Sequence, residues 1–305
     1  MRETLITPEE INIPTFNVPP MDAAFNALST QLDAANSPTE LYLSTGSLSL
    51  QRTLEENAPD FVSVLSSSKQ ILDEGLGYFL IKGSEIQAQP LPVAELAALA
   101  ISSFYGEPTR SSLRDPRLVW PVQYAEYEGS ELTFSQTKDE ASLHTDSQYF
   151  ENPEPYFGLF CMTSDEPGKG TSSLVRADEV VASLKSARGN NVLDELKKSF
   201  PFKVPPIFTE TGTPEEIVVT WAPILEENKV RYRLDTLNAA LKIGSKITKE
   251  QLEAMGAFNE VLAGSPSTNY HMEPGDIMFV NNHKVLHSRS AYSNPDRLLL
   301  RVRVK

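Results

Sequence analysis

The chain has 305 residues, of which 40% are hydrophobic, enough for a large catalytic domain with a substantial apolar core. Its 27 lysines and arginines stand against 41 aspartates and glutamates, which gives a formal net charge of −14. This charge argues against nucleic acid or an anionic membrane surface as a partner. No apolar run approaches the length of a membrane span.

The cellular compartment is indicated by two features of the sequence. The first ten residues, MRETLITPEE, lack the continuous apolar stretch of a secretory signal. The only cysteine, Cys161, lies in an apolar, strand-like run and cannot form a disulfide within the chain. We therefore expect Cys161 to be a small buried residue and the protein to be cytoplasmic.

The first hundred residues are predicted to be mostly helical. Apolar residues at helical spacing predict a helix from Met21 to Ala35, and a second helical region is expected between about Leu48 and Glu74. Tyr78–Lys82 is bracketed by glycines and reads as a buried strand. An alanine- and leucine-rich helix follows from Pro92 to Tyr105, with its proline near the first turn.

From about Val119 onward the pattern becomes that of β-strands. The expected strands are Val119–Tyr124, His144–Tyr149, Tyr156–Ser164, Thr171–Arg176, Glu216–Ala222, Val230–Leu234, Ile277–Asn281 and Leu298–Val304. A hairpin is predicted at Glu226-Glu227-Asn228, between the runs Ile217–Trp221 and Val230–Arg233. Two helical insertions are expected near Ala177–Phe200 and Thr248–Leu262, and the second opens with a capping-box pattern.

Short strands separated by long excursions, with a strand at the C-terminal end, predict a mainly β fold with helices. The expected architecture is a double-stranded β-helix, or jelly roll, with N-terminal and inserted helices. A parallel doubly wound fold is disfavoured, because the second half lacks regular strand–helix alternation and a glycine-rich phosphate loop. We expect one domain over residues 1–305, with helical support in 1–118 and the jelly-roll core in 119–305.

His144-Thr145-Asp146 is the most informative stretch for chemistry. On an extended backbone, residues two apart project from the same face, so His144 and Asp146 are predicted to converge. A second imidazole from a distant strand would complete a 2-His-1-carboxylate set, which leaves three positions of an octahedral Fe(II) open for a co-substrate and O2. His287 is the favoured third ligand, His283 is its rival, and His271 is expected to face elsewhere.

A cluster of arginines near the C-terminus supplies a second clue. On a strand, Arg297, Leu299, Arg301 and Arg303 share one face. An arginine that faces a barrel interior is costly unless a carboxylate meets it. A dicarboxylate co-substrate would supply that partner through bidentate hydrogen bonds. Pairing with an aspartate or glutamate of the chain itself is an equally weighted alternative.

Taken together, these motifs resemble a known group of enzymes. His144-Thr145-Asp146, Pro167–Leu174 and the segment from Pro274 to Arg301 resemble the TauD/TfdA and clavaminate synthase-like superfamily. The resemblance covers about Phe79 to the C-terminus and rests on the order and separation of the motifs. It implies an Fe(II)- and 2-oxoglutarate-dependent dioxygenase.

The resemblance also implies roles for individual residues. His144, Asp146 and His287 would be the iron ligands, and O2 the second co-substrate. Arg297 would hold the distal carboxylate of 2-oxoglutarate, with Thr171 as its hydroxyl partner.

Three further residues are candidates for contact with the substrate. Arg301 matches a position that contacts an anionic substrate group in some relatives, so which of Arg297 and Arg301 grips 2-oxoglutarate stays open. Arg289 and Gln136 are the other candidates. The arginines suggest a substrate that carries an acidic group.

Asp146 narrows the expected reaction. Halogenating relatives lack this carboxylate, so its presence favours hydroxylation of an unactivated C–H bond, with release of succinate and CO2. The expected substrate is a small polar molecule, such as an amino acid or another small carboxylate or sulfonate. Desaturation at the same site, a zinc-dependent hydrolase and a non-catalytic binding protein on the same fold are the alternatives. The sequence does not indicate an oligomeric state.

Overall fold

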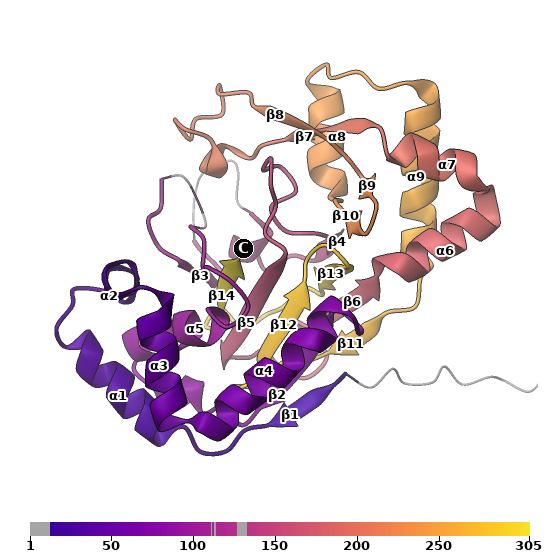
Figure 1. Ribbon diagram of the computed structural model, residues 1–305. Coiled ribbons are helices and arrows are strands. Elements are labelled where there is room, and N and C mark those ends of the chain that lie inside the picture. The colour runs from indigo at the N-terminus through magenta and orange to yellow at the C-terminus, as the bar shows by residue number, and fades with distance from the viewer. Residues whose placement is uncertain (1–12, 111, 113, 127–132) are drawn as a thin grey trace, which may run out of the picture.

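The computed structural model describes residues 13–110, 112, 114–126 and 133–305, and the N-terminal segment, in which we expect no secretory signal, lies outside them. Two β-sheets form its centre (Figure 1). The larger sheet has the strand order β1 (Thr15–Asn17), β2 (Tyr78–Lys82), β12 (Ile277–Asn281), β5 (Tyr156–Thr163), β14 (Leu298–Val304) and β3 (Val119–Val122). The smaller sheet has the order β11 (Thr268–Tyr270), β6 (Ser172–Arg176), β13 (Val285–Arg289) and β4 (Ala141–His144).

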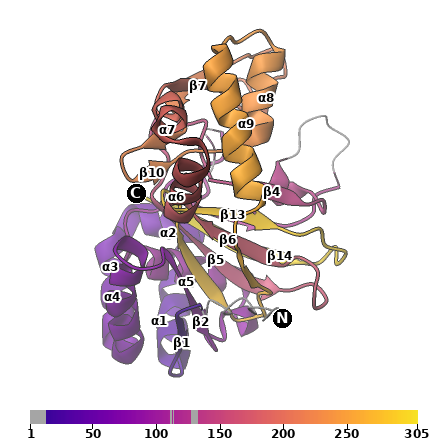
Figure 2. The ribbon, with the colours of Figure 1, turned by 90° about the vertical axis from the view of Figure 1, so that its right-hand side faces the viewer.

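Helices lie on both sides of this pair of sheets, as Figure 2 shows. The N-terminal group comprises α1 (Asp22–Leu32), α2 (Pro38–Thr45), α3 (Ser47–Asn57), α4 (Pro59–Asp73) and α5 (Leu91–Ser102). The second group comprises α6 (Ala177–Arg188), α7 (Asn190–Leu196), α8 (Leu234–Lys242) and α9 (Lys249–Ala263). Short 3-10 helices span Ile86–Ala88, Phe134–Gln136 and Pro206–Phe208, and two small ribbons pair β7 (Ser199–Lys203) with β8 (Val219–Pro223) and β9 (Leu225–Glu226) with β10 (Lys229–Val230).

The larger sheet is apolar on both faces because both faces are covered. Along β12, Ile277 and Phe279 pack into the core shared with the N-terminal helices, whereas Met278 and Val280 belong to the cluster between the sheets. Side chains alternate along a strand, so a strand that is covered on both sides reads as one continuous apolar run. This explains why β2 and β12 are evident in the sequence.

The smaller sheet follows the same rule and thereby orients the site. Along β13, Val285 joins the cluster between the sheets, and Leu286 joins the core formed with α6–α9. The alternation returns His287 to the interior, where it lines a cavity between the sheets. The helical cover thus leaves one face of each strand for the site.

The jelly-roll prediction is confirmed, with corrections to individual elements. The run Val230–Leu234 is not a strand, since β10 ends at Val230 and α8 begins at Leu234, where Leu237 and Ala240 are buried. The strand near Trp221 pairs with β7 and not across the hairpin at Glu226–Lys229, which joins β9 and β10.

The helical region expected near Ala177–Phe200 is two helices followed by a strand. Gly189, at φ 79°, separates α6 from α7, because glycine adopts this left-handed backbone freely. Phe200 lies in β7 and is fully buried. None of the helices in the described part of the chain has the length and apolar character needed to cross a membrane.

The aromatic cluster under the larger sheet provides a test of the fold. Phe279 is fully buried, stacks on Phe79 with ring centroids 5.5 Å apart and lies 4.3 Å from the Tyr105 ring. We expect Phe279→Ala to lower the free energy of unfolding by about 3–5 kcal/mol, measured by urea denaturation. Leu43→Ala, at a side chain 57% exposed, should change it by less than ~0.5 kcal/mol. Equal effects of the two substitutions would contradict this assignment of the core.

Candidate metal centre and co-substrate site

Two histidines meet because their strands pair in register. His144 is the last residue of β4 and lies directly opposite His287 of β13 in an antiparallel ladder. Directly opposed residues carry their side chains on the same face. The two imidazole rings are accordingly close, with centroids 4.4 Å apart.

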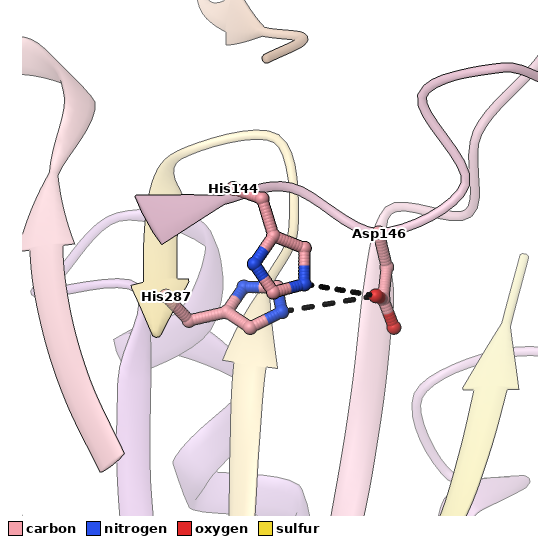
Figure 3. Close-up of side chains that lie close together, drawn as sticks. All are labelled: His144, Asp146 and His287. Atoms are coloured by element: carbon pink, nitrogen blue, oxygen red, sulfur yellow. Dashed lines mark ion pairs between the residues drawn. The ribbon is translucent and has the colours of Figure 1, made fainter. Parts of the chain in front are cut away.

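The carboxylate reaches the same point from a turn. β4 ends at His144, so the extended backbone expected through Asp146 is wrong, and Ser147 has a left-handed φ of 57°. The predicted convergence nevertheless occurs: Asp146 Oδ1 lies 3.7 Å from His144 Nε2 and 3.8 Å from His287 Nε2 (Figure 3). The three ligand atoms are within 4.8 Å of one another.

The remaining histidines lie outside this cluster. His283 Nε2 is 3.1 Å from the carbonyl oxygen of Pro153, and His271 Nδ1 is 3.1 Å from that of Lys169. Within the described residues, His144, Asp146 and His287 are the one group of this kind that could hold a metal ion. His287 is therefore favoured over its rival.

The electrostatics favour the ionisation states that bind a metal. Burial, together with the nearby imidazole of His287, lowers the pKa of His144 to about 4, so the His144 imidazole is neutral at pH 7. His144 Nδ1 lies 2.7 Å from the carbonyl oxygen of Ser142. A carbonyl only accepts, so Nδ1 carries the proton and Nε2 keeps its lone pair toward Asp146.

Asp146 is held as a carboxylate by its neighbours. Burial opposes its ionisation, but the charge of Arg301 and the two adjacent imidazoles outweigh burial and hold its pKa well below the ordinary range. Arg301 Nη1 donates to Asp146 Oδ2 at 2.8 Å. Oδ1 alone therefore faces the two imidazoles.

The two arginines expected to share a face do line one cavity, but they differ in their partners. Arg301 pairs with Asp146, which fulfils the internal-pairing alternative for this residue. Arg297 is only 3% exposed, and its buried Nη1 has no hydrogen-bond partner among the described residues. Its guanidinium lies 4.9 Å from the centre of the Tyr292 ring, and burial lowers its pKa. A buried guanidinium without an acid partner fits the carboxylate of a bound ligand.

A hydroxyl residue other than the predicted one lines the cavity together with Arg297. Ser172 of β6 is buried and lines the cavity with Arg297, whereas Thr171 is not among the cavity residues. Thr171 precedes β6 by one position, and the alternation of side chains places it on the opposite side from Ser172. Only the strand register, which the sequence does not show, distinguishes the two.

Arg289 and Gln136 make contacts different from those expected. Arg289 lines the cavity, but its Nη1 donates to the Phe134 carbonyl at 3.1 Å and its Nη2 to the Thr137 carbonyl at 3.0 Å. Gln136 Oε1 accepts from the backbone N–H of Thr133 at 3.3 Å and does not line the cavity. Both side chains thus stabilise the loop beside the site.

The wall of the cavity away from the polar residues is apolar. It is formed by Phe157, Leu174, Met278 and Leu299.

 Leu159 of β5 belongs to the same wall. These side chains keep water away from the metal ligands and from Arg297, which strengthens the electrostatic interactions inside the cavity.

Comparison with known proteins agrees with this geometry. The family model described as "Taurine catabolism dioxygenase TauD, TfdA family" matches residues 52–303. A search of curated protein sequences found no match.

Solved structures with the same fold are numerous. The non-heme iron oxygenase OrfP, in complex with Fe and alpha-ketoglutaric acid, is 17% identical, with a TM-score of 0.70 over 96% of this chain and 94% of that one. An asparagine oxygenase, in complex with Fe(II), 2S,3S-3-hydroxyasparagine and succinate, is 16% identical, with a TM-score of 0.71 over 95% of this chain and 93% of that one. At this identity the likeness establishes the fold.

The family match covers most of the chain, and the cluster of His144, Asp146 and His287 falls inside it. The chain therefore belongs to the TauD, TfdA family of Fe(II)- and 2-oxoglutarate-dependent dioxygenases.

Proposed function

We propose that this oxygenase hydroxylates an unactivated C–H bond of a small polar molecule that carries an acidic group. We assign the iron to His144, Asp146 and His287, and the distal carboxylate of 2-oxoglutarate to Arg297. The observation that supports this assignment most strongly is the buried Arg297 guanidinium, which lacks an acid partner among the described residues and shares one cavity with both imidazoles.

The proposal gives separate roles to the iron site and to three side chains around it. Bound iron, with O2 and 2-oxoglutarate, supplies the oxidising chemistry that ends in a hydroxylated product, succinate and CO2. Arg297 and the Ser172 hydroxyl orient the co-substrate by charge and hydrogen bonding. Arg301 keeps one oxygen of Asp146 occupied, so that the other is available to the metal.

The charges around the site favour an acidic substrate. Arg301 lies beside the carboxylate ligand, and its buried Nε has no hydrogen-bond partner among the described residues. An amino acid is the favoured class, because similar folds hold (3S)-hydroxy-L-Arg in OrfP and 3-hydroxyasparagine in the asparagine oxygenase. Arg289, whose two terminal nitrogens bind backbone carbonyls, is proposed to shape the adjoining loop. The buried Cys161 supports a reducing, cytoplasmic location.

His287→Ala should abolish the metal centre. We expect the variant to lose the visible charge-transfer band that forms when 2-oxoglutarate is added to the Fe(II) protein without oxygen, because one of three protein ligands is gone. Succinate formation should disappear with it. His271→Ala is the matched control, since His271 lies outside the cluster, and it should keep the band. A band that survives in His287→Ala would rule out this ligand set.

Arg297→Ala should separate co-substrate binding from metal binding. We expect the Kd for 2-oxoglutarate to rise at least about tenfold, as for loss of a charged hydrogen bond. The Kd for Fe(II), measured anaerobically, should change little because Arg297 is not a ligand. Arg188→Ala removes a surface arginine that pairs with Glu260 and should leave both constants unchanged. Equal weakening of both by Arg297→Ala would argue against the assigned role.

Substitution of two adjacent hydroxyl residues tests the strand register. Ser172→Ala should weaken 2-oxoglutarate binding by about tenfold, because its hydroxyl lines the cavity with Arg297. Thr171→Ala should leave the affinity unchanged, because Thr171 does not line the cavity. Titration calorimetry on both variants measures the difference, and the opposite ranking would restore Thr171 as the hydroxyl partner.

A further inference from the structure

We propose that Asn282 is a positioning residue that fixes the carboxylate ligand Asp146. This inference rests on the proposed metal centre, and it concerns how the chain holds a ligand that no strand supports. Asn282 lies between β12 and β13 and is only 1% exposed.

The Asn282 side chain binds both sides of the Asp146 backbone. The Asp146 N–H donates to Asn282 Oδ1 at 2.7 Å, and Asn282 Nδ2 donates to the Asp146 carbonyl at 3.0 Å. The same Nδ2 donates to the carbonyl of Glu154 at 2.8 Å. The Asn282 amide thus accepts one hydrogen bond from the segment between β4 and β5 and donates two hydrogen bonds to it.

Asp146 needs such support because its backbone is irregular. The residue lies in a turn, and the next residue, Ser147, has the left-handed φ of 57° that costs a non-glycine residue about 1 kcal/mol or more. Arg303 donates to the Ser147 hydroxyl, which holds the following position. Asn282 acts on the ligand residue itself.

Asn282 also connects Asp146 to the strands that carry the rest of the site. Its own N–H donates to the Pro155 carbonyl at 2.7 Å, so its backbone is fixed against the start of β5. β13, which begins at Val285, carries His287. Asn282 therefore places the carboxylate and the distal imidazole in one rigid frame. A partner that orients a metal ligand in this way typically changes metal affinity by about 10–100-fold when removed.

The preceding asparagine provides a matched control. Asn281 is also buried, and its side chain likewise accepts from one backbone N–H, that of His283, and donates to one carbonyl, that of Leu72. None of these bonds reaches Asp146. Asn281→Ala and Asn282→Ala thus remove similar buried hydrogen bonds from adjacent positions, but only the second removes bonds to the metal ligand.

The test uses the full chain with Co(II) as an oxygen-insensitive probe. We expect Asn282→Ala to raise the Kd for Co(II) by about 10–100-fold and to alter the visible Co(II) absorption spectrum, because the carboxylate is no longer fixed. Both substitutions should lower the melting temperature of the metal-free protein by a similar amount. Asn281→Ala should nevertheless keep the wild-type Co(II) affinity and spectrum. If Asn282→Ala does not fold, Asn282→Asp, which keeps the acceptor but loses both donations, is measured in its place.

Two results would overturn the proposal. One is wild-type Co(II) affinity and spectrum in the Asn282 variant that folds, and the other is equal loss in the Asn281 and Asn282 variants. Failure of the wild-type protein itself to bind Co(II) would instead contradict the metal centre proposed above. The two failures are therefore distinguishable.

Discussion

The antiparallel pairing of β4 with β13 is the constraint on which the site depends. It sets His144 opposite His287 and so creates two of the three ligand positions from backbone hydrogen bonds. The register is secured by burial, because Val285 and Leu286 pack on opposite sides of β13. If the pairing shifted by one residue, His287 would leave the interior and Leu286 would point into the cavity in its place. Buried apolar area would then be lost on both faces of the strand. The same packing that stabilises the fold therefore fixes the metal ligands.

The third ligand, Asp146, is held in place in a different way. Asp146 is not held by a ladder but by side chains, with Arg301 on one carboxylate oxygen and Asn282 on the backbone. Such bonds cross 136 and 155 positions of sequence, so the carboxylate reaches its place only when the C-terminal strands are in position. Assembly of the centre is for this reason coupled to completion of the two sheets.

The sequence allowed most of the architecture to be predicted where burial alone determines the pattern. β2 and β12 are covered on both faces and read as apolar runs, whereas β13 carries the polar residues His287, Ser288 and Arg289 in its second half, so its sequence does not indicate a strand. The ligand set could be inferred because it depends on residue type and order. The proposed choice of Ser172 over Thr171 could not, since it depends on where β6 begins.

The same limit applies to side chains whose role arises from long-range contacts. Asn282 lies in the segment from Pro274 to Arg301, but the sequence indicates no role for it, because its partner Asp146 lies in another element. Arg289 was expected near the substrate, yet its terminal nitrogens bind carbonyls of the loop that follows Phe134. The sequence shows that an arginine carries a positive charge, but only the fold shows which group it contacts.

The contrast between the two cavity arginines bears on which of them would hold 2-oxoglutarate. Arg301 is paired with Asp146, so an incoming carboxylate would have to share its guanidinium with the metal ligand. Arg297 is buried with no acid partner among the described residues, and its desolvation is offset only by the face of Tyr292 and more distant charges. A dicarboxylate that binds Arg297 gains a charged hydrogen bond without breaking one, whereas binding at Arg301 would weaken the hold on Asp146. This contrast supports the proposal that Arg297 holds 2-oxoglutarate while Arg301 holds Asp146.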